Sequence, residues 1–187
     1  MRKRSILLIG GARSGKSNYA EALAREEGNE VLFVATAEAG DDEMKCRIEA
    51  HKRSRPSNWH TLEAPCEVGR AIKKITHGYD VIVLDCITLL VTNILCKYMA
   101  IDGEEVSEKA VEEGVNTEIN AIIDIIKENP ATYIIVTNEV GEGIIPIGSS
   151  TRIYRDVLGR ANQMLAAACN EVYLLVAGIP LCVKPGV

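Results

Sequence analysis

Aromatic residues and an excess of positive charge are both missing from this chain. Its 187 residues include one Trp, one Phe and six Tyr, and its formal net charge is −5. So few aromatic side chains make base-stacking surfaces improbable, and the negative charge gives no general attraction to nucleic acid or anionic lipid. We therefore expect no nucleic-acid partner.

Apolar stretches long enough to cross a bilayer are also missing. The apolar run after the basic N-terminal residues covers only residues 5–9, which is too short for a signal peptide or a membrane span. The run from Cys86 to Cys96 is interrupted by Thr88, Thr92 and Asn93. We expect no membrane span.

The six cysteines contain no Cys-x-x-Cys pair, and several lie in apolar runs. This pattern is typical of reduced thiols, and it predicts a cytoplasmic protein.

Short apolar runs rich in β-branched residues and Leu alternate with longer segments of helical apolar spacing. The short runs are continuously apolar, as expected for parallel strands that are covered on both faces. The expected strands are residues 6–9, 31–35, 81–84, 133–137 and 172–176, with a short edge strand at 181–184. The expected helices are residues 15–27, 42–53, 67–75, 87–99, 107–128 and 150–168. The pattern predicts one α/β domain over residues 1–187, with a mainly parallel sheet flanked by helices.

Two segments depart from this alternation. Residues 97–105 are expected to form a polar loop between helices. Residues 138–150 are rich in Gly and Pro and directly follow an expected strand. Loops at the carboxyl ends of parallel strands surround the ligand in open sheets, so we expect binding groups in this second segment.

Residues 10–17 read Gly-Gly-Ala-Arg-Ser-Gly-Lys-Ser and match the phosphate-loop pattern G-x-x-x-x-G-K-[ST] between an expected strand and an expected helix. In such a loop, backbone N–H groups bind phosphate oxygens, Lys16 reaches the β- and γ-phosphates, and the Ser17 hydroxyl ligates Mg²⁺. The motif predicts a nucleoside triphosphate site made by Gly10, Gly11, Ala12, Arg13, Ser14, Gly15, Lys16 and Ser17.

Asp85 follows the expected strand 81–84. P-loop proteins place the acid that holds the Mg²⁺ shell at such a position, so we expect Asp85 to be a metal ligand together with Ser17. An Asp at this place also fits an N-cap of the helix that follows, and this alternative stays open.

His51 lies in a basic segment at the end of the expected helix 42–53. Arg47, His51 and Arg55 are four residues apart, so they share one face while the helix lasts. Nearby cations disfavour the imidazolium, keep the ring nucleophilic and attract a polyphosphate. From the residues alone, two interpretations stay open: a nucleophile or acid/base group at a phosphate, and a solvated basic helix face with an incidental histidine.

A series of motifs occurs in a fixed order from the phosphate loop to about Gly178. They are residues 10–17, 34–37, 41–51, 55–63, 84–93, 136–146 and 155–163. In this order they resemble the bifunctional adenosylcobinamide kinase / adenosylcobinamide-phosphate guanylyltransferase family of cobalamin biosynthesis.

The resemblance implies a RecA-like P-loop fold that carries out two reactions. ATP or GTP phosphorylates the aminopropanol hydroxyl of adenosylcobinamide. A histidine then attacks the α-phosphate of GTP, and the GMP passes from the GMP-histidine to the corrinoid phosphate, which gives adenosylcobinamide-GDP. The resemblance also implies Mg²⁺ as cofactor and a homo-oligomer, trimers among them.

The resemblance assigns the nucleophilic histidine to His51. The nucleotide contacts that it implies are the phosphate loop 10–17, Ala35, Thr36, Ala37, Lys52, Arg53, Ser54, Arg55, Glu63 and Asp85.

For residues 138–146 and the polar residues of the last helix we expect contacts with the corrinoid or with another subunit. Pairing within that helix, Arg152 with Asp156, is equally compatible with the spacing. Two other functions also stay open: a P-loop kinase of another small hydroxylated substrate without guanylyl transfer, and a RecA-like nucleotide switch with a protein or DNA partner.

Overall fold

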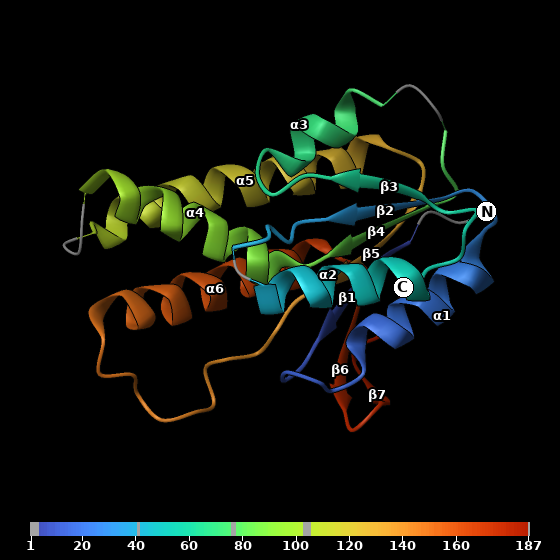
Figure 1. Ribbon diagram of the computed structural model, residues 1–187. Coiled ribbons are helices and arrows are strands. Elements are labelled where there is room, and N and C mark those ends of the chain that lie inside the picture. Colours follow the sequence, from blue (N-terminus) through green and yellow to red (C-terminus); the bar gives the residue numbers. More distant parts are fainter. Residues whose placement is uncertain (1–3, 41, 76–77, 103–105, 187) are drawn as a thin grey trace.

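The computed structural model describes residues 4–40, 42–75, 78–102 and 106–186, without the side chains of residues 43, 44, 47, 50, 51, 54 and 100–102. These residues form a seven-stranded sheet in the order β3-β2-β4-β5-β1-β6-β7 (Figure 1). All neighbouring strands run parallel except β6 and β7, which are antiparallel. The strands are β1 (Ser5–Ile9), β2 (Val31–Ala35), β3 (His60–Glu63), β4 (Val81–Asp85), β5 (Thr132–Val136), β6 (Glu171–Val176) and β7 (Ile179–Lys184).

Helices lie on both faces of this sheet. Figure 1 shows α1 and α2 in front of the strands, and α3 to α6 on the other side. The helices are α1 (Lys16–Glu27), α2 (Asp42–Ser54), α3 (Val68–Lys73), α4 (Ile87–Asp102), α5 (Glu108–Glu128) and α6 (Ser149–Ala168). The mainly parallel α/β architecture expected from the sequence is therefore confirmed.

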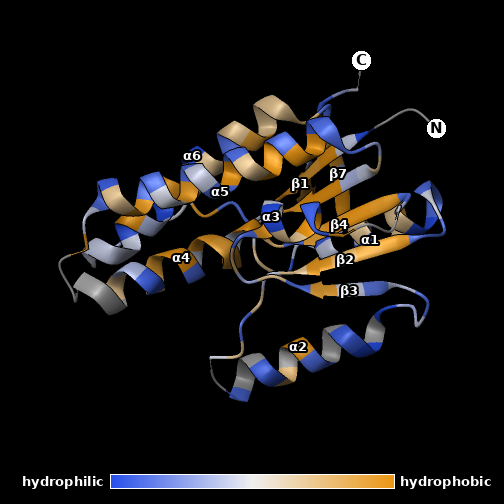
Figure 2. Cartoon of the chain, turned by 90° about the horizontal axis from the view of Figure 1, so that it is seen from above, coloured by the Kyte–Doolittle hydropathy of each residue, from blue (hydrophilic) through white to orange (hydrophobic). Residues whose placement is uncertain are grey.

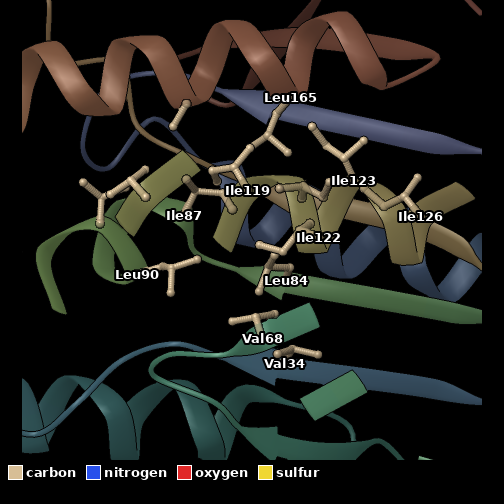
Figure 3. Close-up of a cluster of buried hydrophobic side chains, with 14 of the residues drawn as sticks. Val34, Val68, Leu84, Ile87, Leu90, Ile119, Ile122, Ile123, Ile126 and Leu165 are labelled. Atoms are coloured by element: carbon tan, nitrogen blue, oxygen red, sulfur yellow. The ribbon is translucent and has the colours of Figure 1, made fainter. Parts of the chain in front are cut away.

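Each central strand divides its side chains between two apolar clusters. In β4, Ile82 and Leu84 belong to the cluster under α3 to α6, where Figure 3 shows Leu84 near Ile122. Val81 and Val83 belong to the cluster under α1. Because side chains alternate along a strand, Asp85 falls on the face of Val81 and Val83, which is the face of α1 and the phosphate loop.

The longest helix, α5, begins at an N-cap, where the Ser107 hydroxyl accepts a hydrogen bond from the backbone N–H of Ala110. It carries buried apolar residues three and four positions apart, including Ile119, Ile122 and Ile126. This spacing makes one apolar stripe, which packs on the sheet between α3 and α6 (Figure 3).

The structure differs from the expected elements in three places. The edge strand β3 was not expected, because three of its four residues are exposed and it has no apolar run to mark it. The edge strand β7 begins at Ile179 rather than at residue 181. The expected loop 97–105 is wrong for residues 97–102, because α4 continues to Asp102 while Tyr98 and Met99 pack against the core. Residues 103–105 lie outside the described residues.

Residues 137–148 connect β5 to α6 without helix or strand, close to the loop expected there. Three large side chains of this segment are exposed: Ile144, Ile145 and Ile147. Among the described residues, every helix is too short or too polar to cross a membrane.

Candidate nucleotide-binding site

The phosphate loop connects β1 to α1. It is held by the segments that follow β5 and β6, the two strands on either side of β1. The N–H of Glu139, after β5, donates to the Gly10 carbonyl at 3.0 Å, and the N–H of Gly178, after β6, donates to the Ser14 carbonyl at 2.8 Å. Gly15 has a φ of +94°, and a Cβ there would lie 3.0 Å from the Cα of Gly178. The motif therefore needs glycine at position 15 both for its backbone angle and for the close approach of this neighbour.

Lys16 lies inside the loop with 7% of its surface exposed. Its Nζ donates to the carbonyl oxygens of Gly10 at 3.1 Å and Gly11 at 2.7 Å, and to Ser14 Oγ at 3.4 Å. Burial lowers the pKa of the Lys16 ammonium, and the Asp85 carboxylate acts in the opposite direction. The loop thus holds a desolvated cation at the N-terminal end of α1.

A cavity of about 780 Å³ opens between the phosphate loop, the carboxyl ends of β2, β4 and β5, and α2. It collects most of the expected nucleotide contacts: Ala12, Arg13, Ser14, Gly15, Lys16, Ser17, Ala35, Ala37, Lys52, Arg55, Glu63 and Asp85. Its other lining residues are Asn18, Glu38, Ala39, Ile48, Pro65, Cys86, Thr88, Leu89, Val136 and Asn138. A volume of this size is typical of a small-molecule or cofactor site.

Four of the expected contacts do not line this cavity. Gly10 and Gly11 direct their carbonyl oxygens at Lys16. Thr36 is fully buried, and its hydroxyl donates to the Cys86 carbonyl at 2.7 Å and accepts from the Cys86 N–H at 2.8 Å. Arg53 pairs with Glu49 and lines a neighbouring cavity of about 560 Å³. The side chain of Ser54 lies outside the described residues.

Ser17 and Asp85 both line the large cavity. Asp85 pairs with Ala35 in the register of β4 and β2, so it stands at the carboxyl edge of the sheet. The helix that follows starts at Ile87, after Cys86, so Asp85 does not occupy the N-cap position. A hydroxyl and a carboxylate oxygen are hard donors that suit Mg²⁺ when a nucleotide supplies further oxygens.

The position of His51 is defined by the backbone of α2, while its side chain lies outside the described residues, as does that of Arg47. Three residues of the same segment, Ile48, Lys52 and Arg55, line the large cavity. Position 51 is three residues from Ile48 within α2, so helical periodicity puts it close to that same face of the helix. Figure 2 shows α2 as a polar helix standing beside β3.

Lys52 and Arg55 bring positive charge to the cavity from the side of α2. Lys52 forms an ion pair with Glu63, and this contact lowers the pKa of the Glu63 carboxyl. Burial lowers the pKa of Arg55, against the attraction of Asp85 and other acidic groups. A polyanion in this cavity would lie between these cations and Lys16.

Asn93 contributes to the site, and the residue pattern had given it no role. From α4, its side-chain amide donates to the carbonyl oxygens of Thr36 at 2.8 Å and Pro65 at 2.9 Å. It therefore ties together the segments that follow β2 and β3. The only sequence feature that could have indicated this role is that Asn93 is a polar residue within an apolar helical run.

Cys86 also lines the cavity, and burial raises the pKa of its thiol to about 12. A thiol with so high a pKa stays protonated and is a poor nucleophile or metal ligand.

On α6, the pairing of Arg152 with Asp156, one of the two alternatives left open by the sequence, is not found among the described contacts. Arg152 donates instead to the carbonyl oxygens of Pro146 and Ile147, because the preceding loop folds back over the first turn of the helix. Asp156 pairs with its neighbour Arg155 at 2.9 Å. Arg160 pairs with Glu112 of α5 at 2.9 Å. The loop 137–148 is thus attached to α6 through Arg152.

A phosphate loop, a carboxylate at the end of a nearby parallel strand and one cavity between them define a P-loop nucleotide-binding protein. The chain belongs to the family described as cobinamide kinase / cobinamide phosphate guanyltransferase, whose sequence profile matches residues 6–183. The recognition made from the ordered motifs is therefore confirmed. So are the enzyme class and the kinase and guanylyltransferase function, at the level of the family.

Named relatives agree over nearly their whole length. The chain is 44% identical to the bifunctional adenosylcobalamin biosynthesis protein CobU of Escherichia coli K12, with 96% of this chain and 99% of the relative covered. It is 44% identical to CobU of Salmonella typhimurium LT2 with the same coverage, and 38% identical to CobP of Pseudomonas aeruginosa, with 95% and 96% covered.

Two solved structures of much lower identity are also similar to this chain. The Pyrococcus horikoshii OT3 protein of project PH0250 matches with a TM-score of 0.53 at 8% identity, over 99% of this chain and 88% of that one. The RadB recombinase matches with a TM-score of 0.49 at 16% identity, over 91% and 73%. The sheet order and the phosphate loop confirm the expected P-loop fold with a mainly parallel sheet flanked by helices.

Proposed function

We propose that this chain catalyses both reactions of its family on one nucleotide site. It phosphorylates the aminopropanol hydroxyl of adenosylcobinamide with ATP or GTP, and it then transfers GMP from GTP to the resulting phosphate through a GMP-histidine at His51. One observation carries the proposal: the phosphate loop and the basic face of α2 that contains position 51 line the same cavity.

In the kinase step, the phosphate loop and Lys16 hold the triphosphate. The substrate hydroxyl oxygen attacks the γ-phosphorus, the bond to the β-phosphate oxygen breaks, and the hydroxyl proton is released. Catalysis here depends on positioning and on cations around the transferred group, both of which the loop supplies. Ser17 and Asp85 would hold Mg²⁺, which when bound neutralises charge on the phosphate oxygens.

In the guanylyl transfer step, a neutral imidazole nitrogen of His51 attacks the α-phosphorus of GTP and pyrophosphate leaves. A phosphate oxygen of the corrinoid then attacks the same phosphorus, and the bond to the histidine nitrogen breaks. Lys52 of α2 and Arg55, which directly follows α2, line the cavity and stabilise the negative charge that develops on the α-phosphate.

We propose further that residues 1–187 act as one domain in the cytoplasm and assemble as a homo-oligomer such as a trimer. The resemblance to the family supports the assembly, and the scattered cysteines, free among the described residues, support the location. Light scattering on the purified protein measures the assembly directly.

The test of the nucleophile uses GTP labelled at the α-phosphate. The wild-type enzyme should acquire an acid-labile covalent label, His51→Ala should acquire none, and His60→Ala serves as the matched control. His60 lies on β3 outside both cavities and should keep the label. Phosphorylation of adenosylcobinamide should survive better than labelling in His51→Ala. If adenosylcobinamide is phosphorylated but no label forms on the wild type, the chain is a kinase alone.

A further inference from the structure

Four side chains form a continuous stack of charges and rings next to the large cavity. The Cζ atom of Arg55 lies 3.6 Å from the ring centroid of Phe33. The Phe33 and Trp59 rings are stacked, with centroids 6.5 Å apart and planes 24° apart. Arg25 of α1 lies over the other ring, with its Cζ 5.8 Å from the Trp59 centroid. The single Phe and the single Trp of the chain are therefore both placed in this stack.

The two ends of the stack face different surroundings. Arg55 lines the cavity that contains the phosphate loop, whereas Arg25 does not. Phe33 and Trp59 are buried, with 3% and 9% of their surface exposed, and belong to the apolar cluster under α1. The two rings thus support Arg55, which is one of the cations that line the cavity.

Arg55 carries hydrogen-bond donors that no described protein group satisfies. Its Nε and Nη1 atoms are buried and lack a partner among the described residues. Buried donors of a charged group cost free energy unless they are paired, so such an arrangement is kept where a ligand supplies the acceptor. Phosphate oxygens are strong acceptors for the N–H donors of a guanidinium.

Stacking on Phe33 determines which part of Arg55 is free for a ligand. The guanidinium carbon lies 3.6 Å from the centre of the ring, so the ring supports the group on one side, and this contact uses none of its N–H donors. Acidic groups around the cavity, Asp85 and Glu63 among them, attract this cation. Without the ring, the side chain would be free to turn toward these carboxylates.

We infer that Phe33, supported by Trp59, is a positioning residue that aims Arg55 at a phosphate of the bound nucleotide. This inference rests on the proposed nucleotide site and deepens it. Neither ring lines the nucleotide cavity, so both rings act through Arg55. Arg55 is the contacting group, and the stack removes its freedom to bind elsewhere. Arg25 lies at the far end, so its contribution is expected to be small.

The test is a double-mutant cycle on Phe33 and Arg55, read out as the dissociation constant of GTP and as the rate of covalent labelling. Phe33→Leu should weaken GTP binding or slow labelling by about tenfold, which is the effect of a moderate cation–π contact. Phe33→Tyr keeps the ring face and should stay within about twofold of the wild type. In an Arg55→Ala background, Phe33→Leu should have almost no further effect.

Val31→Ala is the matched control for core damage. Val31 is buried on β2, on the same face as Phe33 and in the same apolar cluster. It should lower the unfolding temperature and leave GTP binding unchanged.

Two results would overturn the inference. One is a Phe33→Leu effect of the same size with and without Arg55, which would mark the ring as merely structural. The other is unchanged GTP binding and labelling in Phe33→Leu. The dissociation constant does not depend on a covalent intermediate, so a wild-type enzyme that binds GTP without labelling would refute the transfer step and still leave this cycle readable.

Discussion

Lys52 of α2 and Glu63 at the carboxyl end of β3 form an ion pair at the candidate nucleotide cavity. Both side chains are substantially exposed, at 47% and 63%. Exposed pairs contribute only about 1 kcal/mol or less to stability, so the main consequence of this pair is to fix the C-terminal turn of α2 beside the sheet.

Glu63→Gln should therefore lower the free energy of unfolding by less than about 1 kcal/mol, while it weakens GTP binding several-fold. The hydrogen bond from Lys52 lowers the pKa of Glu63 in the folded state. The stabilisation by the pair is then fully present above the ordinary Glu pKa and is lost as the pH falls through the lowered folded value. Urea titrations of both proteins at neutral and acidic pH should show their difference in stability vanish at the acidic end.

Glu128→Gln is the control for this prediction. Glu128 of α5 pairs with Lys73 of α3 at 2.9 Å, at similar exposure and away from the cavity. Glu128→Gln should lower the free energy of unfolding by a similarly small amount and leave GTP binding unchanged. Equal losses of GTP affinity in the two variants would contradict a specific role for the Lys52–Glu63 pair.

Lys16→Met should separate binding from stability. Removing the ammonium from the phosphate loop should weaken nucleotide binding by about a hundredfold or more, because a charged contact to phosphate is lost. The unfolding temperature should change little, because the substitution removes a desolvated cation but also the hydrogen bonds that it donates within the loop.

The sign of the pH dependence follows from the lowered pKa of Lys16. The unfolded chain holds this proton more tightly than the folded protein, so charged Lys16 opposes folding at all pH values below its folded pKa. The stability of Lys16→Met relative to the wild type should therefore fall as the pH rises through that value. Lys45→Met, an exposed lysine on α2, is the control and should change neither property. A Lys16→Met protein that binds nucleotide normally would refute the phosphate-loop assignment.

Tyr133→Phe should leave the protein as stable as the wild type or stabilise it by about 1 kcal/mol. Tyr133 of β5 is 1% exposed, and its hydroxyl has no hydrogen-bond partner among the described residues. Burial also raises the pKa of this phenol. Thermal unfolding of the variant measures the effect. Thr137→Val is the contrast, since the Thr137 hydroxyl donates to Asn162 at 2.7 Å, and its loss should destabilise by about 1–2 kcal/mol.

The strands, the phosphate loop and Asp85 were predictable because each has a local sequence signature. Continuous apolar runs marked the buried parallel strands, and the position of the glycines and Lys16 marked the loop. Parallel strands bring their carboxyl ends to the same edge of the sheet, so the sequence predicted that Asp85 and Ser17 lie at the same edge.

Other features depend on tertiary contacts that leave no local signature. The strand β3 is a polar edge strand, and its parallel pairing with β2 is what defines it. The burial of Thr36 and the stacking of Arg55 on Phe33 arise from residues that are far apart in the chain. Arg152 bonds to the loop carbonyl of Pro146 rather than to a partner on its own helix. The residue spacing could not predict this, because the contact depends on the path of the loop.

Asn93→Ala should weaken nucleotide binding by about tenfold and lower the free energy of unfolding by about 1–2 kcal/mol. The Asn93 amide is half-buried and holds the carbonyls of Thr36 and Pro65, the first of which lies between two cavity-lining residues, Ala35 and Ala37. Removing the amide leaves both carbonyls without this donor and frees the two segments to move apart. Calorimetric titration with GTP, together with urea unfolding, measures the two effects separately.

The comparison that isolates the role of Asn93 is Thr92→Val on the same helix. The Thr92 hydroxyl donates to the Thr88 carbonyl of its own helix at 3.0 Å and also bonds to Tyr154 of α6, so its loss does not involve the segments after β2 and β3. Thr92→Val should keep the affinity for GTP while Asn93→Ala loses it. If both variants bind GTP as the wild type does, the segments after β2 and β3 hold their positions without Asn93, and the cavity owes its shape to the sheet alone.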